Sequence, residues 1–188
     1  MCKCTRTDNL AEAKYGTSAW DDHYSKLNGD AELTWGPDPL LTPLGCAQAA
    51  DARELWRVER QYGVPVPEVH FLSPLRRALD TWKITFLSLE DPGRCTDEAD
   101  LRGVILENCR EEYGIHTCDL RSPRAILASA YPSPTFSFED GFPENDPLWL
   151  SDVRETKAHI VERAMSVLDR AFLEDATCMS GFFVSWKA

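Results

Sequence analysis

The stretch from Val69 to Thr81 constrains the fold most strongly, because an apolar run meets Ser73-Pro74 and then a basic helical segment. The apolar run predicts a buried strand, Pro74 fits the first turn of a helix, and Ser73 can cap the free N–H groups there. Such a turn presents backbone donors and the positive end of the helix dipole, which favour an anion. Arg76 and Arg77 add planar sets of donors that match phosphate or carboxylate oxygens. We therefore interpret this stretch as an anion site; the alternative is that both arginines lie on a solvated helix face.

The elements around this stretch follow an α/β order. A helix is predicted over residues 43–62, with Thr42 as its N-terminal cap. The Val69 strand is followed by a second helix, over roughly residues 75–89, and by a second strand over residues 103–106. Helices that alternate with short apolar strands indicate a three-layer α/β fold with a mainly parallel sheet.

A dense polar segment, residues 107–119, follows the second strand. It includes Glu107, Glu111 and His116. Ligands of α/β proteins lie at the carboxyl ends of the strands, so a carboxylate delivered there is well placed for general acid chemistry. The alternative is a solvated acidic loop.

The last third of the chain predicts one irregular segment and one long helix. Residues 131–147 are rich in proline and acidic residues, which predicts a lid-like insertion. Residues 152–173 have the spacing of an amphipathic helix. Its predicted buried stripe consists of Ile160, Val161, Ala164, Val167, Leu168 and Phe172.

Composition limits the function. A chain of 188 residues with 43% hydrophobic residues fits a single domain, and a net charge of -11 argues against binding to nucleic acid or to an anionic membrane. The chain has no apolar run of membrane-spanning length and no secretory signal at Met1, so we expect a cytoplasmic protein. Seven cysteines, an odd number, fit reduced thiols. The Cys2-x-Cys4 pair lacks a second pair at a zinc-site spacing, so we expect neither a metal nor a cofactor.

Three segments resemble motifs of the histidine phosphatase superfamily, in its phosphoglycerate mutase-like, fungal-type branch. They are Leu41-Thr42-Pro43-Leu44-Gly45-x-x-Gln48-Ala49, Ser73-Pro74-Leu75-x-Arg77-x-x-x-Thr81, and Cys109-Arg110-Glu111 with His116-Thr117-Cys118-Asp119. The segment that begins at Asn9 is also similar to the family's sequence just after its first motif. The resemblance covers residues 8–173 and implies a phosphoglycerate mutase-like fold.

The resemblance implies roles for individual residues. In this family a histidine of an Arg-His-Gly motif attacks the phosphoryl group, arginines and a second histidine hold the charge, and an acid protonates the leaving oxygen. Carried over, Arg77 holds the charge and Glu111 is the acid, with Glu107 as the second candidate. Asn9 matches the asparagine that ends the first motif. Together with Arg76 and Lys3, Asn9 and Arg77 are the expected substrate-binding residues, and the substrate would be a small phosphorylated or otherwise anionic metabolite.

The departures from the family pattern concern both ends of the chain. Cys2-Lys3-Cys4 stands where the family has Arg-His-Gly, Asp8 replaces that motif's second histidine, and residues 181–188 contain no histidine. The implied nucleophile is therefore missing, and the central strands of the sheet should be shortened at their ends. Either the sequence is a truncated product of a phosphatase gene or it is a pseudo-enzyme.

Three functions remain open at this point. The first is a phosphomonoester hydrolase or mutase with impaired catalysis. The second is a non-catalytic binder of anions, because an enclosed arginine holds phosphate without any nucleophile. The third is acid–base chemistry on a non-phosphate metabolite, with Glu111 and His116 as the acting groups. In each case Arg77 and Glu111 should come from neighbouring strand ends and lie together, with Asn9, His116 and Lys3 close by.

Overall fold

The computed structural model describes residues 5–65, 67, 69–87, 101–174 and 180–183. Its α-helices are α1 (Thr7–Tyr15), α2 (Thr17–Asp22), α3 (Pro43–Arg60), α4 (Arg76–Phe86), α5 (Arg124–Ala130) and α6 (Lys157–Glu174). Two short 3-10 helices are η1 (Tyr24–Lys26) and η3 (Thr117–Asp119), and the strands are β1 (Val69–Leu72), β2 (Arg102–Ile105), β3 (Phe136–Phe138) and β4 (Ser180–Phe183).

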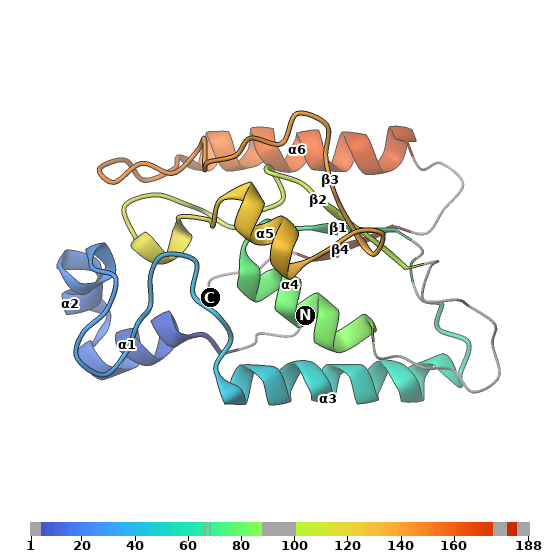
Figure 1. Cartoon of the computed structure of the whole chain (residues 1–188), viewed down its shortest axis with the longest axis horizontal. Helices are drawn as coiled ribbons and strands as arrows, with labels where there is room; N and C mark the ends of the chain where they lie inside the picture. Colours follow the sequence, from blue (N-terminus) through green and yellow to red (C-terminus); the bar gives the residue numbers. More distant parts are fainter. Residues whose placement is uncertain (1–4, 66, 68, 88–100, 175–179, 184–188) are drawn as a thin grey trace.

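The four strands form one sheet in the order β3-β2-β1-β4, and all three pairings are parallel. Val69 lies opposite Arg102 on one side and Ser180 on the other, so β1 is an inner strand. Helix α6 covers one face of the sheet, while α4 and then α3 lie on the opposite side (Figure 1). The predicted three-layer α/β fold with a parallel sheet is confirmed.

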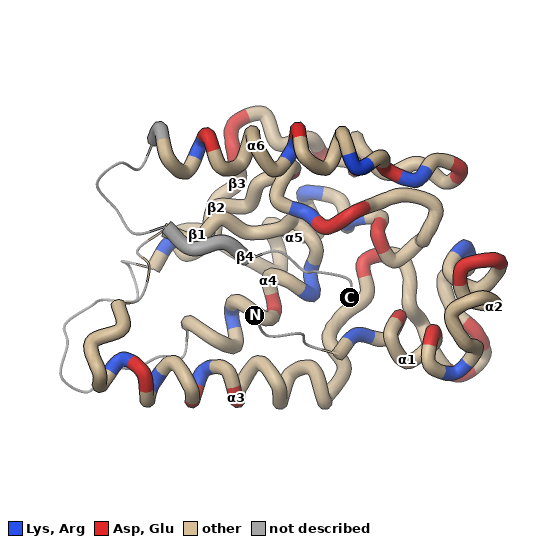
Figure 2. The backbone as a smooth tube through the Cα atoms, turned by 180° about the vertical axis from the view of Figure 1, so that it is seen from behind, with Lys and Arg blue, Asp and Glu red and all other residues tan. Residues whose placement is uncertain are grey.

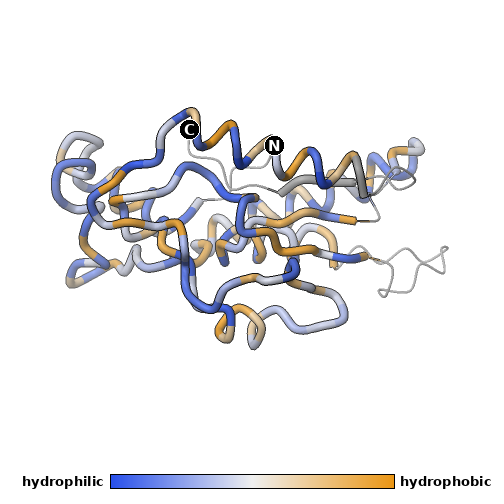
Figure 3. Tube along the Cα trace, turned by 90° about the horizontal axis from the view of Figure 1, so that it is seen from above, coloured by the Kyte–Doolittle hydropathy of each residue, from blue (hydrophilic) through white to orange (hydrophobic). Residues whose placement is uncertain are grey.

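Side chains of β1 alternate between two hydrophobic cores. Leu72 points to the α4 side, where it packs with Leu79, Trp82 and Ile105. Phe71 points to the α6 side, where it packs with Val167. Both faces of the strand are therefore buried, as expected for a parallel strand covered by helices. Along the long helices, hydrophobic and hydrophilic positions alternate (Figure 3).

The predicted N-terminal cap is present at the start of α3, whereas the predicted cap at the start of α4 is not. Thr42 caps α3 by accepting a hydrogen bond from the backbone N–H of Gly45 at 3.0 Å. Ser73 Oγ, in contrast, accepts from the Leu75 N–H, at 3.4 Å, one residue before α4 begins. The first helical N–H, that of Arg76, donates to Oδ1 of the buried Asp38 at 2.9 Å. A carboxylate of the chain thus occupies a donor that the sequence assigned to a bound anion.

Segment 131–147 is less irregular than expected, because it contains β3, which extends the sheet beside β2. Arg121 also holds this segment, since its guanidinium donates to the carbonyl oxygens of Pro143, at 2.8 Å, Glu144, at 3.2 Å, and Asn145, at 2.8 Å. Apolar packing adds to these contacts, because Phe142 belongs to the core on the α4 side. Backbone pairing and a buried arginine therefore fix much of the segment.

The predicted buried stripe of α6 is wrong in part. Val167 is buried, but Val161, Leu168 and Phe172 are 56%, 43% and 73% exposed. The helix instead turns Arg163 inward, one turn before Val167, because its guanidinium binds backbone carbonyl groups of the loop after β2. Hydrophobic spacing does not reveal buried polar partners, so it predicts Arg163 on the exposed side of the helix.

Charged positions are distributed over the whole fold. Basic and acidic positions alternate along α3 and α6 (Figure 2). None of the helices in the described part of the chain is both long and apolar enough to cross a membrane.

Candidate functional site

The motif at the start of α3 positions the first described residues of the chain. Thr42 binds the carbonyl oxygen of Thr5 through its backbone N–H at 3.1 Å and through its hydroxyl at 3.0 Å. The amide oxygen of Gln48 accepts from the Thr5 N–H at 2.7 Å. A Cβ atom on Gly45 would lie 2.2 Å from the Thr5 oxygen, so glycine is needed for this close approach. Thr42, Gly45 and Gln48 thereby hold the segment that carries Arg6 and Asp8.

Arg77 lies just beyond the carboxyl end of β1, in the first turn of α4, and is 1% exposed. One guanidinium nitrogen, Nη1, donates to the carbonyl oxygen of Cys118 at 2.8 Å. The other, Nη2, binds Glu111 Oε1 and lies 3.8 Å from Asp119 Oδ1. Because Glu111 follows β2, the ends of neighbouring strands deliver the arginine and the carboxylate to one place, as the resemblance implied.

Arg6 completes this arrangement from the N-terminal segment. Its Nη1 lies 2.8 Å from Glu111 Oε1, and its Nη2 lies 2.8 Å from Asp8 Oδ2. Both Arg6 and Asp8 are buried. We call Arg6, Asp8, Arg77, Glu111 and Asp119 the Arg77 cluster.

Carboxylates control the charge state of the Arg77 cluster. Burial alone would lower the pKa of Arg77, but Glu111 and Asp8 outweigh it and raise the pKa, so the guanidinium stays protonated. Burial also raises the pKa of the neighbouring Asp38, although the positive charge of Arg77 opposes this shift. The cluster holds two guanidinium groups and three carboxyl groups, and a bound anion would compete with these carboxylates for Arg77.

Arg163 of α6 fixes the backbone that leads to Glu111. Its guanidinium donates to the carbonyl oxygens of Asn108 at 2.8 Å, Arg110 at 3.0 Å and Glu111 at 3.4 Å. Glu155 holds the same guanidinium through both carboxylate oxygens at 2.6 Å. Burial would raise the pKa of Glu155, but the hydrogen bonds from Arg163 and from His159 lower it. Glu155 therefore stays charged, and Arg163 positions Glu111 through its main chain.

Glu107, the second candidate for the acid, belongs to a different cluster. Its carboxylate binds Arg110 Nη1 at 2.9 Å and Arg121 Nε at 2.8 Å. Burial raises its pKa, although the two arginines lower it. Arg110 also makes a two-point ion pair with Asp146, at 2.9 Å for both oxygens. This second cluster ties segment 131–147 to the loop after β2. Of the two candidate acids, Glu111 lies in the Arg77 cluster and Glu107 does not.

The remaining predicted site residues make contacts other than those expected for substrate-binding or catalytic groups. The amide oxygen of Asn9 accepts from the Arg6 N–H at 3.1 Å, so it caps the start of α1. Arg76 is half-buried, and its backbone N–H is held by Asp38. The ring Nε2 of His116 lies 3.6 Å from Asp21 Oδ1. Lys3 lies outside the described residues.

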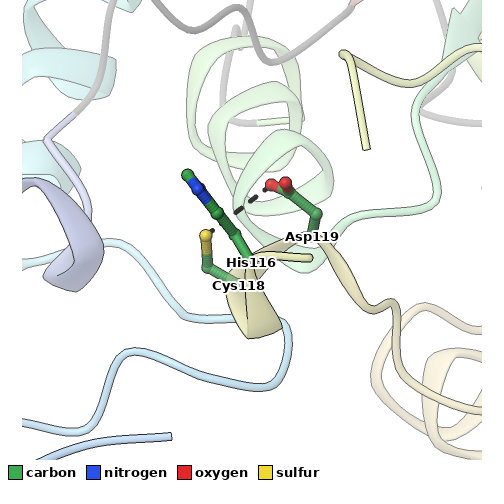
Figure 4. Close-up of side chains that lie close together, drawn as sticks. All are labelled: His116, Cys118 and Asp119. Atoms are coloured by element: carbon green, nitrogen blue, oxygen red, sulfur yellow. Dashed lines mark hydrogen bonds between the residues drawn. The ribbon is translucent and has the colours of Figure 1, made fainter. Parts of the chain in front are cut away.

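His116 is brought together with two other side chains of η3. Figure 4 shows it beside Cys118 and Asp119, and all three residues are buried. Trp149 donates to the His116 carbonyl oxygen at 2.8 Å.

Sequence reasoning missed Arg6, Asp119 and Arg163. Asp8 did carry a signal, because it stands at a histidine position of the first motif. Arg6 carried none, since its position depends on how Thr5 packs on α3. Arg163 carried none either, since its inward position depends on backbone oxygens of the loop after β2.

The fold and the Arg77 cluster define the class of the protein: an α/β domain with a charged site at the carboxyl ends of parallel strands. No protein-family model matches the chain. The chain is 43% identical over 173 residues to a protein of Arthroderma benhamiae named "Probable phosphoglycerate mutase", covering 92% of this chain and 50% of that protein.

Two other fungal proteins are also similar. "Probable phosphoglycerate mutase PMU1" of Saccharomyces cerevisiae is 33% identical, with 94% of this chain and 66% of that protein covered. "Phosphomutase-like protein 3" of Candida albicans is 32% identical, with 87% of this chain and 48% of that protein covered. The chain belongs to the phosphoglycerate mutase-like proteins of the histidine phosphatase superfamily. It spans about half to two thirds of the length of these relatives.

Proposed function

We propose that these 188 residues bind a small phosphorylated or otherwise anionic metabolite at the Arg77 cluster, and that they do not transfer its phosphoryl group. The observation that carries the proposal is the geometry of Arg77. Its guanidinium is buried, protonated and fixed by the Cys118 carbonyl oxygen at the carboxyl ends of β1 and β2. A rigid guanidinium with donors on two nitrogens matches two oxygens of a phosphate or carboxylate group.

The ligand would replace carboxylate contacts within the cluster. An anion oxygen would take the position of Glu111 Oε1 at Arg77 and Arg6, where this one oxygen now binds both guanidinium groups. Displacing a buried carboxylate opposes binding, so we expect a dissociation constant in roughly the millimolar range, equivalent to about -4 kcal/mol.

Family membership supports the substrate class and the role of the acid. Two of the relatives are named as probable phosphoglycerate mutases. We infer that Glu111 is the group that would protonate a leaving oxygen, and that Arg77 and Arg6 would hold the phosphoryl charge. The nucleophile is the missing part, because Asp8 and Lys3 stand at positions where the resemblance places histidines.

Acid–base chemistry by Glu111 and His116 has less support. The ring of His116 has Asp21 beside it at 3.6 Å, and Glu111 is engaged by two arginines. We further propose a cytoplasmic protein with no nucleic-acid or membrane partner, because its net charge is -11 and its odd number of cysteines fits reduced thiols.

Calorimetric titration tests the proposal. Phosphate, sulfate and succinate are titrated into the intact chain and into Arg77→Gln, with Arg57→Gln as the matched control. Arg57 is an exposed arginine of α3 that pairs with Glu54, and it lies far from the cluster in the sequence. We expect measurable heat and a higher melting temperature with millimolar phosphate for the intact chain and the control, and neither for Arg77→Gln. Absence of both effects in the intact chain, or an unchanged response of Arg77→Gln, contradicts the proposal.

A further inference from the structure

Three ligand-type side chains meet at η3, beside the Arg77 cluster. A ring nitrogen of His116, Sγ of Cys118 and a carboxylate oxygen of Asp119 all lie within 4.8 Å of one another (Figure 4). Imidazole, thiolate and carboxylate are the three side-chain groups that zinc binds in proteins. The sequence predicted no metal site, because Cys2-x-Cys4 is not followed by a second pair at a zinc-site spacing.

The distances fit one small divalent ion. A tetrahedral zinc ion with a sulfur ligand at about 2.3 Å and an oxygen ligand at about 2.0 Å holds these two atoms about 3.5 Å apart. Cys118 Sγ and Asp119 Oδ1 are 3.6 Å apart, so this edge of a tetrahedron is already formed. The histidine nitrogen lies within 4.8 Å of both atoms, so it needs to move inward by no more than about 1.5 Å to complete three ligands at tetrahedral spacing.

Neighbouring groups hold the three ligands in place. Trp149 fixes the backbone of His116, and Arg154 Nη1 binds Asp119 Oδ2 at 3.2 Å, which leaves Oδ1 directed at Cys118. Asp21, whose side chain is 57% exposed, lies 3.6 Å from His116 Nε2 and adds a negative charge on the solvent side. Outer partners of this kind orient metal ligands and keep them charged.

The local charge accepts a cation. Two guanidinium groups, those of Arg77 and Arg154, lie near Asp119 and oppose a metal ion. Arg6 also pairs with Glu111 and with Asp8, so the groups around η3 and the Arg77 cluster are three guanidinium groups and four carboxylates, those of Asp8, Asp21, Glu111 and Asp119. The Cys118 thiol becomes an anion when it binds a metal.

We propose that His116, Cys118 and Asp119 bind one divalent zinc-type ion. The Cys118 S–H bond breaks, a sulfur–metal bond forms, and one proton is released to solvent. The site leaves an open fourth position, as zinc sites with three protein ligands do. This inference goes beyond the proposed anion binding and does not depend on it, since Arg77 is not a ligand.

A cobalt titration tests the site, because Co²⁺ replaces Zn²⁺ and gives a thiolate-to-metal absorption band. The intact chain is stripped of metal with a chelator and titrated with Co²⁺. We expect one ion per chain and a thiolate band. Cys118→Ser should lose the band and bind at least about 100-fold more weakly, since even the loss of an outer partner of a metal ligand costs 10- to 100-fold.

Two controls locate the thiolate. Cys46→Ser removes an exposed cysteine of α3 and should leave the titration unchanged. The double substitution Cys2→Ser and Cys4→Ser removes two further thiols, which lie outside the described residues. It should also leave the titration unchanged. A band that survives Cys118→Ser, or no band in the intact chain, overturns the proposal.

A second readout covers the case in which Cys118→Ser folds poorly. Zn²⁺ should raise the melting temperature of the intact chain and of Cys46→Ser, because an ion that binds only the folded state stabilises it. His116→Gln should reduce this increase by binding Zn²⁺ at least about tenfold more weakly. An equal increase in His116→Gln contradicts the site.

Discussion

Arg6 Nη1 lies 2.8 Å from Glu111 Oε1, although 105 positions separate the two residues in the chain. The same carboxylate oxygen also binds Arg77. One oxygen of Glu111 therefore joins the N-terminal segment, the start of α4 and the loop after β2.

Replacing Arg6 with glutamine should destabilise the protein strongly. Asp8 is buried, and in Arg6→Gln it would lose its ion pair with Arg6, while Glu111 would lose the bond that Arg6 donates to Oε1. Breaking a buried ion pair from one side typically costs several kcal/mol, so we expect a loss of about 3 kcal/mol in the free energy of unfolding. Urea unfolding at pH 7 measures this loss.

The matched control for Arg6→Gln is Arg57→Gln, at an exposed pair with Glu54. It should change stability by no more than about 0.5 kcal/mol, as surface substitutions do. If Arg6→Gln is as mild as this control, the ion pairs of Arg6 do not support the fold.

Gly45→Ala should lower stability even though alanine is the better helix former. At an open helical position this change would stabilise by about 1 kcal/mol. Here the new Cβ would lie 2.2 Å from the Thr5 carbonyl oxygen, so we expect a net loss of about 1 to 3 kcal/mol. The loss should appear in urea unfolding.

Ala47→Gly controls for helix propensity in the same helix, because Ala47 is exposed. It should cost about 1 kcal/mol, which shows that α3 responds normally to propensity. A stabilised Gly45→Ala protein would show that Thr5 does not pack against Gly45.

Arg163→Lys should destabilise the loop before Glu111 while keeping the positive charge. Lysine cannot reproduce the planar set of bonds to Glu155 and to three backbone carbonyl oxygens. We expect a loss of about 2 to 3 kcal/mol in unfolding free energy. Arg170→Lys, at a partly exposed position of the same helix, should stay within about 0.5 kcal/mol. Equal losses of stability for the two substitutions would show that the bonds of Arg163 to Glu155 and to the backbone carbonyl oxygens do not support the loop.

His70 should make stability depend on pH. Burial lowers the pKa of His70 to about 4, from 6.5 in the unfolded chain, although its bond to the Pro67 carbonyl oxygen opposes the shift. Between these two values the unfolded chain gains a proton that the folded state does not, so stability is lost as the pH falls from 6.5 toward 4. The loss should reach up to about 3 kcal/mol.

His70→Gln should remove that part of the pH dependence, because glutamine stays neutral and can still donate to Pro67. His23 is exposed, so His23→Gln is the control and should keep the full dependence. Unfolding free energies at pH 6.5 and 4.5 give the comparison. Parallel pH profiles for His70→Gln and the unaltered protein would contradict the prediction.

Local signals predicted the elements well. Thr42-Pro43 located the start of α3, and the apolar run at Val69 located β1, because capping and strand formation depend on neighbouring residues. The pairing of Arg77 with Glu111 also followed, since both residues come after parallel strands whose carboxyl ends share one edge. The single domain and the lid role of residues 131–147 remain predictions.

Long-range contacts were not predictable in the same way. Asp38 caps α4 from 38 positions away, and no local pattern distinguishes it from a surface aspartate. Arg6 reaches the cluster only because Thr5 packs on α3. Arg163 faces inward because its partners are backbone oxygens of a distant loop, which a hydrophobic pattern does not reveal.

Hydrolysis of p-nitrophenyl phosphate measures directly whether the Arg77 cluster only binds a phosphoryl group or also transfers it. The intact chain, Arg77→Gln and Arg57→Gln are assayed over a broad pH range, with a chelator present. We expect all three to release p-nitrophenol at the rate of buffer alone, while phosphate still binds the intact chain and Arg57→Gln. Release above that rate by the intact chain, abolished in Arg77→Gln but kept in Arg57→Gln, would contradict binding without turnover.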